Sequence, residues 1–304
     1  MGTPEFAVPS LEAMLAAGVE VAGVITQPDR PAGRGQEPQA SPIKRLAAGR
    51  NIPVFQPLKI KHPDAVAWVH AARPDVIVVV GYGQIIPPAV FDCPKLGTIN
   101  VHASLLPRYR GAAPIQWAIA RGETVTGVTT MRIDAGLDTG DILLQSEVSI
   151  AAQENAPELG RRLARAGAEL LVRTLQQIDT IPPRKQDPAE ATYAPILTKE
   201  DGRVDWGRPN REIAGQVRGF HPWPGAYTTF RGSLVHLRRV EPVAGPPSRP
   251  GVLEVQGGSL RAACGQGWLD LLELQPEGKK LMSARDFING RRPASGDLLG
   301  EDHP

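Results

Sequence analysis

The sequence predicts an α/β protein, in which a parallel sheet covered by helices is followed by a smaller all-β domain. Helical and extended patterns alternate through the first 178 residues. The expected strands there are apolar on both faces, which is typical of a parallel sheet buried between helices. From residue 226 onward, short apolar runs are separated by glycine and proline, as in a small barrel. The 304 residues are enough for two domains.

The first domain contains one helix with clear boundary signals. Ser41 and Pro42 provide a cap residue and a first-turn proline, and Gly49 stands where the helix should end. The other boundaries follow from the apolar pattern alone. In chain order, the expected elements are a helix over 11–17, a strand over 19–25, the helix from Ser41, a strand over 75–80, an extended segment near Ile99, a helix from Pro114, strands over 128–133 and 142–150, and a helix over 158–178.

The pattern breaks down between residues 179 and 205, where three X-Pro pairs give the composition of a semi-stiff linker. We therefore expect a catalytic domain over 1–182, a linker over 183–205 and a second domain over 206–304. The second domain is mildly basic, which favours a polyanionic partner. Its expected strands cover 226–230, 234–240, 251–255, 259–263 and 268–274.

Composition excludes several classes of protein. The formal net charge is +2, so the chain is not coated with charge for unspecific nucleic-acid binding. Cys93 and Cys264 are the two cysteines, too few for a disulfide framework or a four-thiolate zinc site, and they fit a reducing, cytoplasmic setting. No apolar run approaches the roughly 18 residues that span a bilayer. We expect a soluble monomer.

The densest polar cluster in an apolar context contains Asn100 and His102. If residues 98–102 finish a strand, both side chains project on one face, because side chains alternate along a strand. In an open α/β sheet, ligands bind beyond the carboxyl ends of the strands, and this segment runs into a loop with Pro107 and Gly111. The alternative is a pair of side chains that cap the strand end and bond to the backbone.

A second cluster places Asp134, Asp138 and Asp141 in a glycine-containing loop after a strand. A carboxylate there could orient or ionise a histidine. The spacing does not match the alternating oxygen ligands of a calcium loop, which argues against a metal site. An ordinary solvated Asp/Gly turn stays open as an alternative. The chain also lacks a convincing phosphate-binding glycine motif, so we expect neither a metal nor a nucleotide cofactor.

The two clusters together resemble the two signatures of the folate-dependent formyltransferase superfamily, as Asn100-x-His102-x-Ser104-Leu-Leu-Pro107 and Asp134-x-Gly136-x-Asp138-x-Gly140. The resemblance covers nearly the whole chain and is strongest to the members that act on methionyl-tRNA. It implies a Rossmann-like parallel-sheet domain and an OB-like β-barrel domain. The further segments that carry it are 26–35, 110–116, 220–225, 274–280 and 287–292.

The resemblance also implies a reaction and roles for residues. The formyl group of 10-formyltetrahydrofolate would move to the α-amino group of methionyl initiator tRNA, with folate as the formyl-donor cosubstrate. The implied catalytic trio is Asn100, His102 and Asp138. The implied folate site includes Ser104, Leu105, Leu106 and Pro107, and the expected tRNA contacts are Arg34, Arg30, Lys279 and Lys280.

The chemistry is consistent with this trio. Attack on the formyl carbon creates an alkoxide, which the Asn100 amide and a protonated His102 can stabilise, and losing one such donor typically costs about 3 kcal/mol. A free α-amino group has a pKa near 8, so no strong base is needed to make it neutral. His102 and Asp138 are then expected to relay protons between the amine and the departing folate nitrogen.

One departure concerns the amino terminus. Relatives begin with a short apolar strand before a Gly-Thr-Pro-Glu turn, whereas this chain starts at Met1 with that turn. Loss of the strand would leave unpaired backbone groups on its neighbours. We therefore expect a native start upstream of Met1.

Three competing functions stay open. The first is a formyltransferase acting on a purine precursor or an amino sugar, and the second is a hydrolase that releases formate. Both would share Asn100, His102 and Asp138. The third is a non-catalytic RNA-binding module, against which the complete trio argues.

Overall fold

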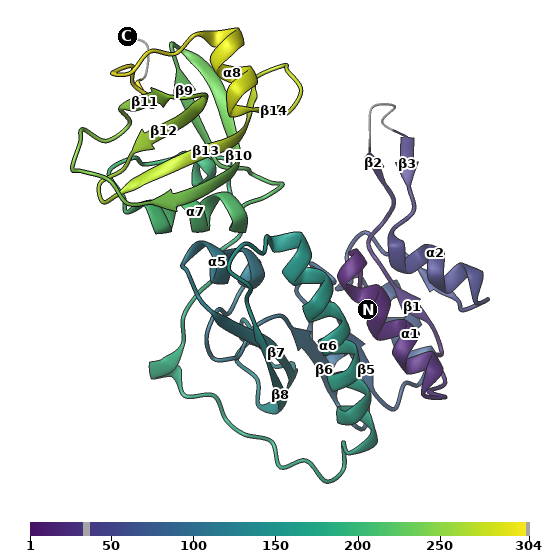
Figure 1. Cartoon of the computed structure of the whole chain (residues 1–304). Helices are drawn as coiled ribbons and strands as arrows, with labels where there is room; N and C mark the ends of the chain where they lie inside the picture. The colour runs from purple at the N-terminus through teal and green to yellow at the C-terminus, as the bar shows by residue number, and fades with distance from the viewer. Residues whose placement is uncertain (33–36, 302–304) are drawn as a thin grey trace. The chain divides into compact units, whose positions relative to one another are not determined.

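The computed structural model describes residues 1–32 and 37–301, which form two compact units (Figure 1). Unit 1 comprises Met1–Pro114, Val125–Ser149 and Gly160–Ala194. Unit 2 comprises Ile115–Thr124, Ile150–Leu159 and Pro195–Pro304. Neither unit is one continuous stretch of chain. Within the described residues, no helix combines the length and apolar character that crossing a membrane would need.

The central sheet of unit 1 has four strands in the order β5-β6-β7-β8. The first pair is parallel and the next two pairs are antiparallel, so this sheet is mixed. The last two strands are consecutive in the chain, and the loop over residues 133–141 reverses the chain direction between them. The strands are β5 (Ile77–Val79), β6 (Thr98–His102), β7 (Val125–Arg132) and β8 (Ile142–Ser149).

A second, parallel pair joins β1 (Val24–Ile25) to β4 (Val54–Phe55). The strand expected over 19–25 is therefore regular only in its last two residues. Met1 and Gly2 lie between this pair and the central sheet. Gly2 donates its N–H to Ile25 and forms a parallel bridge with Val80, whose N–H bonds to the Met1 carbonyl. Met1 and Gly2 thus pair the Val80 N–H group and the Ile25 carbonyl group of the adjacent strands.

The Met1 ammonium group is enclosed in unit 1, where it donates to the Val78 carbonyl at 2.5 Å. Burial lowers the pKa of this amine from 8.0 to about 5, because the charged form loses its hydration. A cavity of about 430 Å³ borders Met1, and its apolar lining includes Val21, Val24, Val69 and Val76.

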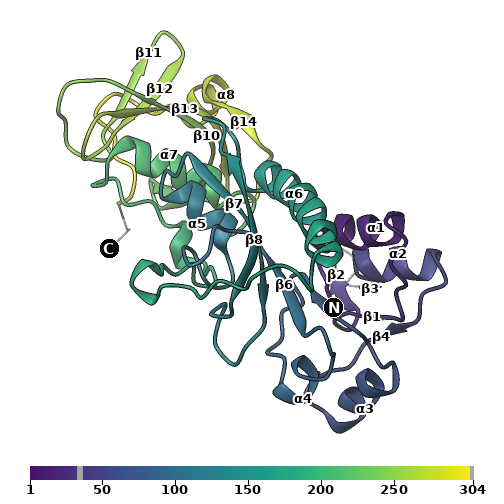
Figure 2. The ribbon, with the colours of Figure 1, turned by 90° about the horizontal axis from the view of Figure 1, so that it is seen from below.

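Helices cover both faces of the unit 1 strands. Ile77 and Val79 pack into one apolar cluster with residues of α3 and α4, whereas Val76, Val78 and Val80 pack into another with residues of α1 and α6. Figure 2 shows these helix pairs on opposite sides of the strands. The alternation explains the apolar character of both strand faces. The helices of this layer structure are η1 (Glu5–Ala7), α1 (Val8–Ala16), α2 (Pro42–Gly49), α3 (Pro63–Ala71), α4 (Pro88–Phe91) and α6 (Ala156–Gln176), the last beginning in unit 2.

The helix expected from Ser41 is confirmed, with Ser41 Oγ accepting from Lys44 N at 3.3 Å. Before it, a hairpin that the sequence did not predict pairs β2 (Arg30–Ala32) with β3 (Glu37–Gln39). The base of the hairpin is fixed by Asp29, which bonds Lys44 at 2.6 Å and Gln56 at 2.7 Å. These two bonds, that of Lys44 first, hold the pKa of Asp29 below its usual value. Arg34 lies outside the described residues.

Unit 2 is built on a sheet in the order β11-β12-β13-β10-β9, with β14 paired to β13. Residues near the end of the chain connect its outer strands, because Leu299 bridges Phe230 and Leu298 bridges Val252. The expected strands are all present. The elements are β9 (Tyr227–Phe230), β10 (Ser233–Val243), β11 (Leu253–Gln256), β12 (Ser259–Ala263), β13 (Trp268–Pro276) and β14 (Met282–Ser283), with helices α5 (Pro114–Ala120), α7 (Asn210–Gly219), α8 (Ala284–Arg291), and η3 (Glu200–Gly202).

The segment that follows α6 is bonded to the rest of unit 1. Residues 183–194 belong to unit 1 and contain η2 (Pro188–Glu190). Arg184 exchanges two backbone hydrogen bonds with Ile142, and Thr192 and Ala194 bond to the backbone of Arg110. We call residues 183–194 the strap.

Candidate active site

His102 ends strand β6 and is held from two sides. Its Nε2 lies 2.9 Å from the carbonyl oxygen of Tyr109. Its Nδ1 lies 3.7 Å from Asp138 Oδ2, and the two side chains are only 7% and 14% exposed. The structure therefore brings together a histidine and a carboxylate that are 36 positions apart in the sequence.

The contact with Tyr109 determines which nitrogen is available for chemistry. A carbonyl oxygen can only accept, so Nε2 must carry a hydrogen to make this bond. Nδ1 is then the nitrogen that faces Asp138. Their 3.7 Å separation exceeds a hydrogen bond, so the carboxylate acts on the ring by charge while Nδ1 stays able to bond a third group.

Asp138 lies on the loop that joins β7 to β8 and has a backbone φ of +52°. This left-handed conformation is uncommon for a residue other than glycine and needs support from its surroundings. Part of that support comes from Gly111, whose N–H donates to Asp138 Oδ2 at 2.8 Å. The loop after β6 and the loop after β7 are therefore joined at the carboxylate.

Asn100 shares a strand face with His102, because β6 pairs with β7 without a shift of register between these two residues. Its side chain is half-buried, and its backbone is paired beside Val79 and Met131. An amide and an imidazole thus project from the same face of β6, next to the loop that carries Asp138.

The other two carboxylates of the predicted cluster have different surroundings. Asp134 Oδ1 accepts from Gly136 N and from Thr139 Oγ1, at 3.0 and 2.7 Å, and so closes a turn within the loop. The Asp141 carbonyl oxygen bonds the Arg132 N–H. Among residues 1–32 and 37–301, no group of three or more His, Cys, Asp or Glu side chains is placed to hold a metal ion.

The predicted folate residues form a tightly bonded segment after β6. Ser104, Leu106 and Pro107 are buried, and Leu105 is half-buried. Ser104 Oγ donates to the Arg108 carbonyl at 2.6 Å, while the Ser104 carbonyl accepts from Thr129. These contacts fix the course of the segment next to His102, and the role of its residues toward folate stays a prediction.

The predicted tRNA contacts are distributed over both units. Arg30, at the start of the unit 1 hairpin, is exposed and donates to Gln27 Oε1 at 2.7 Å. Lys279 and Lys280 are exposed between β13 and β14 of unit 2. Arg34 is outside the described part of the chain.

Sequence reasoning missed two buried polar residues beside the trio. Arg110 is 5% exposed and Gln186, from the strap, is 9% exposed. The guanidinium of Arg110 donates twice to Gln186 Oε1, at 3.0 and 2.8 Å. Gln186 Nε2 in turn donates to the carbonyl oxygens of Asp138 and Gly140. Gln186 lies in a stretch with linker composition, so its sequence context did not indicate that it links Arg110 to the Asp138 loop.

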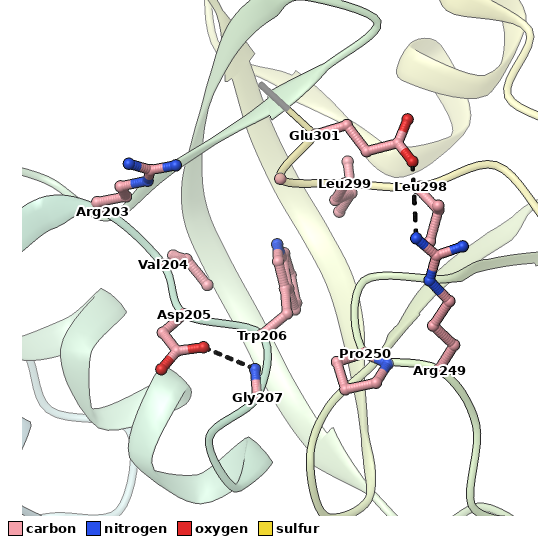
Figure 3. Close-up of a pocket in the computed structure, with 11 residues that line it drawn as sticks. Arg203, Val204, Asp205, Trp206, Gly207, Arg249, Pro250, Leu298, Leu299 and Glu301 are labelled. Atoms are coloured by element: carbon pink, nitrogen blue, oxygen red, sulfur yellow. Dashed lines mark hydrogen bonds and ion pairs between the residues drawn. The ribbon is translucent and has the colours of Figure 1, made fainter. Parts of the chain in front are cut away.

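A cavity of about 480 Å³ lies within unit 2, apart from the residues of the trio (Figure 3). Trp206 forms part of its wall, and an exposed ion pair joins Arg249 to Glu301 at 3.9 Å. Asp205 Oδ1 accepts a hydrogen bond from the Gly207 N–H at 2.9 Å. This cavity contains no histidine or cysteine and does not offer the acid–base pairing present around His102.

This arrangement occurs on a chain that belongs to the formyl transferase family. Residues 1–175 match the formyl transferase domain, and residues 196–292 match the formyl transferase C-terminal domain. The protein is accordingly a formyltransferase with an N-terminal catalytic fold and a β-rich C-terminal domain.

Similar proteins from bacteria carry a more specific name. The chain is 55% identical over 306 residues to a methionyl-tRNA formyltransferase of Solibacter usitatus, covering 100% of this chain and 98% of that protein. It is 56% identical over 303 residues to a methionyl-tRNA formyltransferase of Koribacter versatilis, covering 98% and 97%.

Solved structures share the fold at low identity. An N-formyltransferase of Helicobacter canadensis, in complex with folinic acid and dTDP-3-aminofucose, superposes with a TM-score of 0.67 at 19% identity, over 90% of this chain and 97% of that one. HypX of Aquifex aeolicus, in complex with tetrahydrofolic acid, gives 0.59 at 20% identity, over 88% and 47%.

Proposed function

We propose that this protein transfers the formyl group of 10-formyltetrahydrofolate to the α-amino group of methionyl initiator tRNA, giving formylmethionyl-tRNA for translation initiation in the cytoplasm. The identities of 55% and 56% over nearly full length support the acceptor. The observation that carries the site is the approach of His102 Nδ1 to Asp138 Oδ2, at 3.7 Å, beside the strand face that holds Asn100.

The first step is attack by the neutral amine on the formyl carbon. A C–N bond forms, and the formyl oxygen becomes an alkoxide. The Asn100 amide and the Nδ1–H of protonated His102 are the two donors for this oxygen. Because both come from one strand of a packed sheet, little reorganisation is needed when the charge develops.

The second step breaks the bond between the formyl carbon and the folate nitrogen. The former amine gives up one proton, and the departing folate nitrogen takes one, so the sum of protons is unchanged. His102 and Asp138 hold and pass this proton, directly or through a water. Since Tyr109 occupies Nε2, the relay uses Nδ1.

The remaining predicted residues keep supporting roles in this proposal. Ser104, Leu105, Leu106 and Pro107 line the folate site next to His102. Arg30, Arg34, Lys279 and Lys280 contact the tRNA backbone, so both proposed domains, 1–182 and 206–304, take part in tRNA binding on either side of the proposed linker, 183–205. A steep fall of tRNA affinity with salt concentration would support phosphate contacts.

Single-turnover formyl transfer tests the trio. We expect N100A, H102A and D138N each to lower the rate by about 100-fold or more, because each removes a donor or the group that orients it. D134N is the matched control, since an amide oxygen can still accept from Gly136 and Thr139. Unchanged transfer by H102A and D138N together with full folding would refute the assignment.

The acceptor is tested in one further assay. The protein is incubated with 10-formyltetrahydrofolate and with charged initiator tRNA, charged elongator tRNA, a nucleotide-linked amino sugar, or no acceptor. We expect formylation of the initiator alone. Formylation of the sugar, or release of formate without an acceptor, would replace the proposed function with one of the alternatives.

A further inference from the structure

The side-chain amide of Gln186 links Arg110 to the Asp138 loop through four hydrogen bonds, an arrangement we call the junction. Its two N–H groups point to two carbonyl oxygens, those of Asp138 at 2.8 Å and Gly140 at 2.7 Å. Its carbonyl oxygen accepts both hydrogen bonds from Arg110, at 3.0 and 2.8 Å. A buried amide that uses two donors and two acceptor positions has no unsatisfied capacity.

The chemistry of the junction selects glutamine. Rotating the amide by half a turn would set its N–H groups against the guanidinium and its oxygen against two carbonyl oxygens. The observed orientation is therefore fixed by its neighbours. Because a cation contacts the amide oxygen, the amide N–H groups become stronger donors toward the loop.

The junction joins the two segments that hold the proposed catalytic pair. Arg110 stands between Tyr109, whose carbonyl binds His102, and Gly111, whose N–H binds Asp138. Gln186 contacts the Asp138 loop at its left-handed residue and again two residues later. Displacement of Gln186 would thus act on both partners of the pair.

The strap fixes the position of the junction. Thr192 accepts from the Arg110 N–H through its carbonyl and from the Tyr109 N–H through its hydroxyl, at 2.8 Å each. The Ala194 N–H donates to the Arg110 carbonyl at 2.7 Å. On the other side of Gln186, Arg184 exchanges two backbone hydrogen bonds with Ile142, so residues on both sides of Gln186 are bonded to neighbouring segments of unit 1.

We infer that Gln186 is a positioning residue for formyl transfer, which sets the Asp138 carboxylate against His102 through the Arg110–Gln186 junction. This inference rests on the proposed function, since it assigns Gln186 an effect through Asp138. Gln186 does not itself touch the reacting atoms.

Two substitutions distinguish the contact of Gln186 with Arg110 from its contacts with the Asp138 loop. Q186L keeps the approximate size and removes every hydrogen bond. Q186E keeps a strong acceptor for Arg110 but places oxygen against the carbonyl oxygens of Asp138 and Gly140. A residue needed only to accept the hydrogen bonds of Arg110 would tolerate Q186E, whereas a residue needed to hold the loop would not.

Gln216 provides a matched control. It is 3% exposed on α7 of unit 2, and its Nε2 likewise donates to two backbone carbonyls, those of Asp201 at 2.7 Å and Arg203 at 3.0 Å. Q216L removes the same type of double contact within unit 2, whereas the trio belongs to unit 1. We expect it to lower the melting temperature and to leave kcat within twofold.

For Q186L and Q186E we expect kcat to fall by about 10- to 100-fold, because a displacement near 1 Å in a catalytic group costs about that much. The KM values for both substrates should change less than threefold. In a D138N background, Q186L should add little further loss, because residues that act as one unit are non-additive. Thermal unfolding of each variant reports whether it folds, and Q186E carries the test if Q186L does not.

Several outcomes overturn the inference. These are an unchanged kcat, a loss confined to KM, tolerance of Q186E, or full additivity with D138N. If D138N itself leaves kcat unchanged, the proposed role of Asp138 fails instead. The double substitution thus distinguishes the two failures.

Discussion

Adding one methyl group at Gly140 should disturb catalysis more than its size suggests. A Cβ at this position would lie 1.9 Å from the carbonyl oxygen of Arg132, and real Cβ atoms stay about 3.0 Å away, so the two must separate by about 1.1 Å. The obstacle is strand backbone rather than a flexible side chain. The loop that holds Asp138 is therefore the part expected to move.

The magnitude follows from this displacement. Overpacking of this kind typically costs about 1–3 kcal/mol of stability. A shift near 1 Å in the carboxylate that faces His102 costs about 100-fold in rate. We expect G140A to fold with reduced stability and to lose about 100-fold in kcat, with smaller changes in KM.

Steady-state kinetics and chemical unfolding measure the two effects separately. Gly49 supplies the control, since a Cβ there meets nothing within 4 Å and its φ is not positive. G49A should leave kcat unchanged and should not reduce stability. A folded G140A enzyme with kcat within threefold of wild type would refute the view that the loop position limits the rate.

Two further predictions concern unit 2. F287A should lower the free energy of unfolding of unit 2 by about 3–5 kcal/mol, because Phe287 is fully buried and its ring centroid lies 5.6 Å from that of Phe230. Urea unfolding measures this loss, and a value below about 1 kcal/mol would contradict the packing. Burial, with a smaller contribution from Arg238, holds the pKa of His236 below 6.5, so the unfolded state binds the proton first and stability falls as pH drops below about 6.5. H236F should make the unfolding free energy less dependent on pH in that range, and an unchanged pH slope would exclude His236 as a contributor.

Local patterns predicted the elements whose signals lie within a few residues. Ser41, Pro42 and the following apolar positions defined a helix that the structure confirms. The alternation at residues 98–102 placed Asn100 and His102 on one strand face. Such features depend on period and capping, which neighbouring residues determine.

The missed features depend on contacts between distant segments. Gln186 lies in a proline-rich stretch, and its role appears only when Arg110 and the Asp138 loop are brought to it. The hairpin of β2 and β3 was also missed, because Pro31 and Pro38 argue against strands when considered alone. The antiparallel pairing of β7 with β6 is likewise a contact between separate segments, which the residues of β7 alone do not specify.

The resemblance supplied what periodicity could not. Composition and pattern alone ended at an α/β protein with a second β domain, and left Asn100 and His102 open as a strand cap. The pairing with Asp138 depended on two motifs being considered together. Its geometry, with Tyr109 on one nitrogen of the ring and the carboxylate near the other, required coordinates.

The strap has a practical consequence for anyone preparing a minimal catalytic fragment. Cutting the polypeptide after the last turn of α6 would remove the strap, including Gln186 and Thr192, although its composition is that of a linker. Unit 1 extends to Ala194, and the chain leaves it for unit 2 at 115–124 and 150–159. A fragment cut at residue 182 would therefore lose the contacts of Gln186 with Arg110 and the Asp138 loop, and those of Thr192 with Tyr109 and Arg110.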